Sequence, residues 1–65
     1  MADDLLSIVI ITYNSAREIT PCLESVYADL GQRPAELIAV DSASIDSTIA
    51  IIRANFPHVL IRALP

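Results

Sequence analysis

Polar side chains follow directly after two aliphatic stretches of this sequence. The stretch SIVIITYN passes from an aliphatic run to a hydroxyl, a phenol and an amide at Thr12, Tyr13 and Asn14. A second aliphatic stretch, ELIAV, is followed by Asp41 and Ser42. An aromatic ring can stack on a base, and a carboxylate can accept a hydrogen bond from a ring N–H or a ribose hydroxyl. These residues predict a site for a nucleoside rather than for a triphosphate.

The usual phosphate-binding motifs are absent from the sequence. Gly31 is the single glycine, so neither G-x-G-x-x-G nor G-x-x-x-x-G-K-[ST] can occur. This excludes a Rossmann dinucleotide fingerprint and a P-loop. Asp41 and Asp46 lack the ligand spacing and the turn glycine of an EF-hand. Asp46 is left with two interpretations, a cap for a following helix or a group at the edge of the site.

Three strands are expected to position these polar groups. Residues 6–12 are apolar at consecutive positions and rich in β-branched side chains, which is typical of a parallel strand covered on both faces. Residues 36–41 form a second strand of this kind, and residues 59–63 form a third. The first two strands both end in the polar residues described above.

Segments whose apolar residues have the spacing of a helix lie between the predicted strands. In residues 15–30 we expect Thr20 to cap a helix, Pro21 to begin it and Gly31 to end it in a left-handed conformation. A second helix is capped by Ser44 or Asp46 and ends at Pro57. The expected buried stripes are Ile19, Cys22, Leu23, Val26, Tyr27 and Leu30 in the first helix, and Ile45, Ile49, Ile52 and Phe56 in the second.

The resulting order is βαβαβ, which predicts an α/β fold. Crossovers between parallel strands are right-handed, so we expect a Rossmann-like three-layer unit in which helices cover a parallel sheet. Ligands of such sheets bind outside the carboxyl ends of the strands. Residues 12–14 and 41–42 are expected to meet at that edge.

Composition narrows the class of protein. The chain has 65 residues, a net charge of -4 and four basic residues, all of them arginine, which disfavours nucleic-acid binding. One cysteine cannot form an internal disulfide, so a reducing, cytoplasmic setting is expected. Asp3 and Asp4 stand where a secretory signal would carry basic residues, and the apolar run at 8–11 is too short to cross a membrane. We therefore expect one domain, residues 1–65, without a membrane segment.

The two motifs together resemble a known family. SIVIITYNSAREITPCLESV followed by ELIAVDSASIDST is similar to the opening of family 2 glycosyltransferases with the GT-A fold, over Ser7 to about Phe56. The resemblance implies that Thr12, Tyr13 and Asn14 line a nucleotide pocket. It also implies that Asp41 reads the base or the ribose.

The same resemblance implies a donor and an acceptor. The donor would be a nucleotide sugar such as a UDP- or dTDP-sugar, and the acceptor a glycan or lipid, as in cell-surface polysaccharide biosynthesis. Asp46 would stabilise the loop or lie at its edge. Three residues depart from the family pattern. Ser42 stands where the family usually has Asn or Asp, Ile45 where Thr is common, and Ser47 where Gly is common.

Other parts of the family pattern do not occur before Pro65. The missing parts are the D-x-D motif, which holds Mg²⁺ or Mn²⁺, and the catalytic base. The segment Ala2–Asp4 is no substitute for the D-x-D motif, because it precedes the first strand. We therefore expect the N-terminal part of a GT-A domain, inactive in isolation, with no catalytic residue. The alternatives are a stand-alone nucleotide-binding or interaction module and a non-functional truncated product. Without a second neighbour, the strand at 7–12 is expected to self-associate through its edge.

Overall fold

A computed structural model describes residues 5–65 of the chain. Its elements are β1 (Leu6–Thr12), α1 (Ile19–Leu30), β2 (Ala35–Ser42), α2 (Thr48–Asn55) and β3 (Leu60–Leu64). The βαβαβ order is confirmed. The acidic residues Asp3 and Asp4, which entered the signal-peptide argument, and the segment Ala2–Asp4 lie outside the described residues.

The strands form one parallel sheet in the order β1-β2-β3. The register of β1 on β2 runs from Leu6 opposite Ala35 to Thr12 opposite Asp41. The parallel sheet that the sequence predicts is therefore confirmed. Within residues 5–65, β1 pairs only with β2 and is an edge strand.

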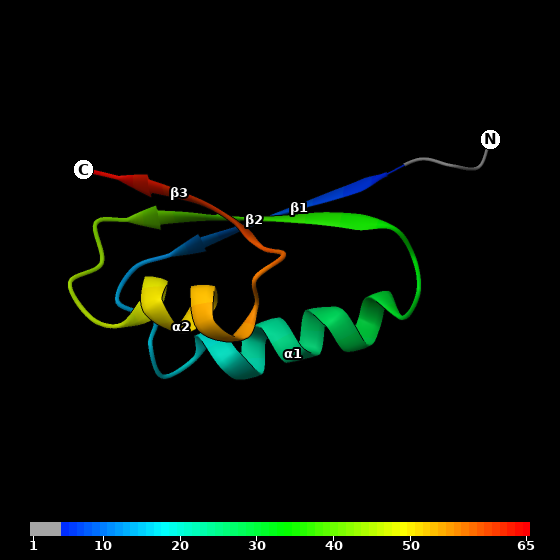
Figure 1. The fold of residues 1–65 in the computed structure, drawn as a ribbon, viewed down its shortest axis with the longest axis horizontal. Coiled ribbons are helices and arrows are strands. Elements are labelled where there is room, and N and C mark those ends of the chain that lie inside the picture. The colour runs from blue at the N-terminus through cyan, green and yellow to red at the C-terminus, as the bar shows by residue number, and fades with distance from the viewer. Residues whose placement is uncertain (1–4) are drawn as a thin grey trace.

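Both helices lie on the same side of the sheet (Figure 1). Each crossover places the next strand one position further along the sheet in the same direction. Two crossovers of the same handedness that progress in the same direction place both helices on the same face of the sheet. Residues 5–65 thus form two layers, and the expectation that helices cover both faces is wrong for this part of the chain. Val9 and Ile11 of β1 point to the uncovered face and are 56% and 70% exposed.

The hydrophobic core lies between the sheet and the two helices. Ile8 and Ile10 of β1 pack against it, because alternate residues of a strand face opposite sides. No helix within the described residues is long and apolar enough to cross a membrane. The core residues are Ile19, Leu23, Leu30, Leu37, Ala39, Ile52 and Val59.

Helix α1 begins two residues earlier than the sequence predicts. Glu18 is its N-cap, so Thr20 is not the cap and Pro21 is the third helical residue. Proline is tolerated there because the first N–H groups of a helix have no partner within it. Gly31 ends the helix as expected, and its N–H is donated to the Tyr27 carbonyl. Its φ of +60° is combined with a ψ of -118°, which differs from the left-handed helical conformation that the sequence predicts.

Three residues of the expected stripes are exposed, namely Cys22, Ile45 and Tyr27, which is 37% exposed. Cys22 is exposed, because it lies beside the outer edge of β1, where no described element covers it. Ile45 is 92% exposed, because α2 begins only at Thr48 and Ile45 belongs to the preceding loop. Ile52 of α2 is fully buried, as the periodicity predicts, and Phe56 packs against the core.

Candidate functional site

The carboxyl ends of β1 and β2 lie side by side, as the sequence predicts. Thr12 and Asp41 are opposite each other in the register, and each is 1% exposed. The hydroxyl of Thr12 donates a hydrogen bond of 2.6 Å to Oδ1 of Asp41. This bond joins residues that are 29 positions apart in the sequence.

The Asp41 carboxylate also organises the loop that follows it. Ser44 donates its hydroxyl to Oδ1 at 2.6 Å and its backbone N–H to Oδ2 at 2.9 Å. Desolvation by burial alone would raise the pKa of Asp41, but the bonds from Ser44 and Thr12 together hold it below its ordinary value. Asp41 is therefore ionised at neutral pH, and both of its oxygens are engaged within the chain.

A second set of bonds ties the β1–α1 loop to the β2–α2 loop. The backbone N–H of Asn14 donates to Ser44 Oγ at 2.8 Å, and Asn14 Oδ1 accepts the backbone N–H of Ile45 at 2.9 Å. Asn14 has φ +46°, a left-handed conformation that asparagine tolerates better than most residues. The side chain of Asn14 thus fixes the neighbouring loop.

Asp46 provides the third connection. Its Oδ2 accepts the backbone N–H of Ala16 at 3.1 Å, while Oδ1 accepts the N–H of Thr48 at 3.0 Å and also the Thr48 hydroxyl. Thr48 Oγ1 in turn accepts the N–H of Ser15 at 2.8 Å. The side-chain bond from Thr48 is the main reason why the pKa of Asp46 lies below its ordinary value. Asp46 thus serves the first turn of α2 and also holds the opposite loop.

We call this set of bonds the loop clasp. The sequence singled out four of its residues but missed Thr48, and it considered Ser44 only as a helix cap. A Ser three residues after a strand-terminal Asp is a turn signal that could have identified Ser44. The residues of the loop clasp are Thr12, Asn14, Asp41, Ser44, Asp46 and Thr48.

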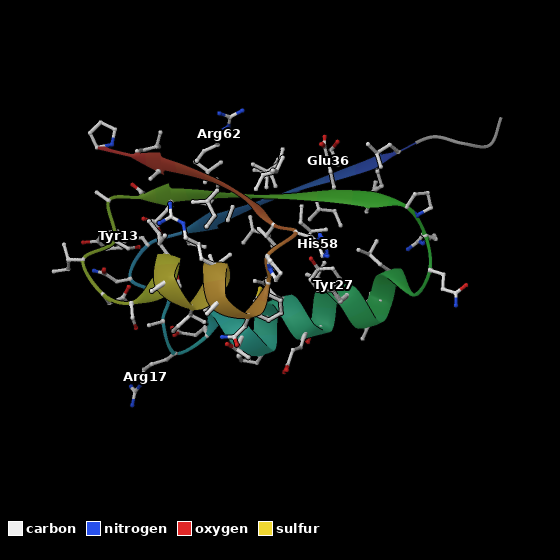
Figure 2. All side chains as sticks on the ribbon, viewed as in Figure 1. Tyr13, Arg17, Tyr27, Glu36, His58 and Arg62 are labelled. Atoms are coloured by element: carbon white, nitrogen blue, oxygen red, sulfur yellow. The ribbon has the colours of Figure 1, made fainter. Side chains whose placement is uncertain are left out.

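Three of the predicted site residues are exposed at this edge, namely Tyr13, Ser42 and Asp46. Tyr13 is 65% exposed, and Ser42, the last residue of β2, is also exposed. Figure 2 shows Tyr13 near the strand ends, whereas Arg17 points away from the sheet on the far side of the helices. Arg17 therefore faces solvent.

The hollow beside the outer edge of β1 is smaller than a typical ligand pocket. It has a volume of about 80 Å³ and lies between β1 and the start of α1, whereas typical ligand pockets have roughly 300–1,000 Å³. Among residues 5–65, no three His, Cys, Asp or Glu side chains are grouped to hold a metal ion. Asp41 and Asp46 are engaged in the loop clasp, so these residues do not fit the Mg²⁺ or Mn²⁺ site that the family implies.

Comparison with known proteins agrees with the motifs. The family model described as Glycosyl transferase family 2 matches residues 7–65. The chain is 43% identical over 53 residues to the SPbeta prophage-derived glycosyltransferase SunS of Bacillus subtilis (strain 168) and, equally, to glycosyltransferase SunS of Bacillus phage SPbeta. These matches cover 82% of this chain and 12% of each relative's length. No solved structure matches it. The chain belongs to glycosyl transferase family 2.

Proposed function

We propose that the carboxyl edge of β1 and β2 binds the nucleoside of a nucleotide-sugar donor, for glycosyl transfer to a glycan or lipid acceptor. The observation that carries this proposal is the exposed ring of Tyr13 on a loop that the loop clasp holds in place. Because the loop backbone is held in place, the ring can stack on a base with little loss of backbone freedom on binding. Membership of the family supports the choice of a nucleotide sugar.

The site residues divide into two roles under this proposal. Tyr13 and Ser42 contact the nucleoside, because their side chains are exposed at the edge of the sheet. Thr12, Asn14 and Asp41 position the loops, since their side chains are already bonded between strands and loops. For Asp41 to read the base, it would have to give up bonds from Ser44 or Thr12.

The donor is a UDP- or dTDP-sugar under this proposal. Stacking on Tyr13 and hydrogen bonds at the strand ends do not require a metal. We therefore expect the nucleoside portion to bind without strong dependence on Mg²⁺ or Mn²⁺, which the full domain of this family would use at the diphosphate.

NMR titration of the chain with UDP and dTDP tests the proposal. Binding should shift the resonances of residues 12–14 and 41–44. Tyr13→Ala should weaken binding roughly tenfold, because aromatic stacking on a base contributes about 1–3 kcal/mol. Tyr13→Phe, the matched control, keeps the ring and should bind within about twofold of the wild type.

Metal dependence is measured in the same titration. Replacing Mn²⁺ by EDTA should change the affinity for UDP by less than about threefold, which is under 1 kcal/mol. Absence of binding, or shifts confined to residues far from the strand ends, would show that the nucleoside site is misplaced.

A second candidate function is a nucleotide-binding module without chemistry. The observation that favours it is that the carboxylates of Asp41 and Asp46 both accept hydrogen bonds within the loop clasp. Neither carboxylate is therefore placed to act as a catalytic base. Donor hydrolysis or glycosyl transfer above background by the purified chain would exclude this second candidate. Binding without turnover would support it.

A further inference from the structure

Four consecutive backbone N–H groups in the β1–α1 loop donate hydrogen bonds to side-chain oxygens. Successive N–H groups that are free can bind an anion, but these groups already have partners within the chain. The loop is therefore built to hold its own conformation. The four groups belong to residues 13–16, and their acceptors are the side chains of Ser15, Ser44, Thr48 and Asp46.

Ser15 connects Tyr13 to helix α2. Its hydroxyl oxygen accepts the backbone N–H of Tyr13 at 3.2 Å, and the hydroxyl is also donated to the Tyr13 carbonyl at 3.2 Å. The backbone N–H of Ser15 in turn donates to Thr48 Oγ1 at 2.8 Å. Both backbone polar groups of Tyr13 are thus bonded to one serine, which is itself bonded to the first residue of α2.

Thr48 can make its two bonds only through a hydroxyl. It is fully buried, and its hydroxyl donates to Asp46 Oδ1, because an ionised carboxylate can only accept. The same oxygen accepts the Ser15 N–H, which can only donate. Serine at this position would keep both bonds, whereas valine has nearly the same shape as threonine and would lose both.

We propose that Thr48 and Ser15 are positioning residues for Tyr13, which raise the affinity for the nucleoside without touching it. This role rests on the proposed function, in which the Tyr13 ring stacks on the base. The side chain of Tyr13 is 65% exposed, so bonds to its backbone rather than packing around its ring hold the residue in place. A loop that is ordered before binding loses less conformational freedom when the nucleotide binds.

NMR titration of the 65-residue chain with UDP and with dTDP measures the role of Thr48. Thr48→Val should weaken nucleotide binding about fivefold, because Tyr13 must then be ordered during binding. Thr48→Ser keeps both bonds and should bind within about twofold of the wild type. Thr20→Val in α1, outside the loop clasp, is the matched control and should bind like the wild type.

Ser15→Ala tests the same connection at a position where folding is less at risk. Ser15 is half-buried, so this variant should fold even where Thr48→Val, at a buried position, does not. It should weaken binding about threefold and lower the backbone order parameter of Tyr13 from about 0.85 toward about 0.6. Ser25→Ala on the exposed surface of α1 is the control and should change neither quantity.

A combination with Tyr13→Ala separates positioning from general destabilisation. Because Thr48 acts through the Tyr13 ring, adding Thr48→Val to Tyr13→Ala should weaken binding further by less than about twofold. A residue that only stabilises the fold would weaken binding by the same factor with and without the ring. Circular dichroism gives the folded fraction of each variant, to which the affinities are referred.

The positioning role and the nucleoside site fail in different ways. A wild type that binds nucleotide, with Thr48→Val and Ser15→Ala binding equally well, would overturn the positioning role and leave the proposed function standing. A wild type that binds neither nucleotide would overturn both the proposed function and the effect on affinity. An unchanged Tyr13 order parameter in Ser15→Ala, or equal losses with and without the Tyr13 ring, would overturn the positioning role alone.

Discussion

Asp41 is 1% exposed and carries donors on both carboxylate oxygens, so Thr12 and Ser44 stabilise its charge in place of water. Lowered pKa values at Asp41 and Asp46 mean that folding favours their ionised forms. The stability that they contribute is present above the ordinary pKa of aspartate, about 4, and is lost as the pH falls through the lower folded value.

The first prediction concerns acid unfolding. The free energy of unfolding should fall as the pH drops below about 4. Asp41→Asn should lower stability at pH 7 by about 2 kcal/mol, because charge-assisted bonds are lost, and should flatten the pH dependence. Urea unfolding from pH 7 to pH 3 measures both effects. Asp29→Asn on the exposed surface of α1 is the control and should keep the wild-type pH dependence. An unchanged profile for Asp41→Asn would contradict the role given to its charge.

Ala43 has φ +55°, a conformation in which the β-carbon crowds the backbone. Ala43→Gly should therefore raise the free energy of unfolding by about 0.5–1 kcal/mol, although glycine also makes the unfolded chain more flexible. Ala50→Gly, at an exposed position within α2, should instead lower it by a similar amount. Thermal unfolding of the two variants measures the difference. A loss of stability in both would show that Ala43 is not strained.

At the scale of elements, α1 and α2 are joined by an aromatic contact. The rings of Tyr27 and Phe56 are stacked, with centroids 6.1 Å apart and planes at 5°. Phe56 also packs against the core just beyond the end of α2. The contact therefore fixes the two helices relative to each other on the covered face of the sheet.

A double-mutant cycle tests this contact. Tyr27→Leu, Phe56→Leu and the double variant should give a coupling of about 0.5–1.5 kcal/mol, the usual range for aromatic pairs. Denaturant unfolding of the four proteins measures it. A coupling near zero would mean that each ring acts only through its own burial.

At the scale of the molecule, a chain of 65 residues buries only about 60% of the surface that its unfolded form exposes. Total stability is therefore on the order of 5 kcal/mol. The sheet face opposite the helices and the β1 edge add apolar surface that residues 5–65 leave uncovered. Partial unfolding or self-association of the isolated chain is still a prediction.

Hydrogen exchange measures how this stability is distributed. The central strand β2 should exchange slowest, at Leu37 to Val40, because it is hydrogen-bonded on both sides and contains the buried Leu37 and Ala39. The edge strand β3 should exchange faster, since it is short and mostly exposed. Equal protection of all three strands would indicate that the edges are covered in solution.

The sequence alone determined the element order, the extent of β1 and the meeting of Thr12 with Asp41 at one edge. Local periodicity was sufficient for this, because a run of β-branched residues or a spacing of three and four specifies an element wherever it lies. The motifs around Tyr13 and Asp41 also predicted the family, which the comparison confirmed.

Only the tertiary structure decided which faces of the helices and of the sheet are covered, and which side-chain oxygens accept hydrogen bonds. Periodicity shows that a face is apolar but not which neighbour covers it, so Cys22, Ile45 and Ile11 were expected to be buried and are exposed. The partners of Asn14 and Asp46 lie in loops some 30 residues away along the chain. Such bonds form only when the crossovers bring two strand ends together. The bonds from Thr12 and Ser44 likewise make the Asp41 carboxylate a buried connection between loops.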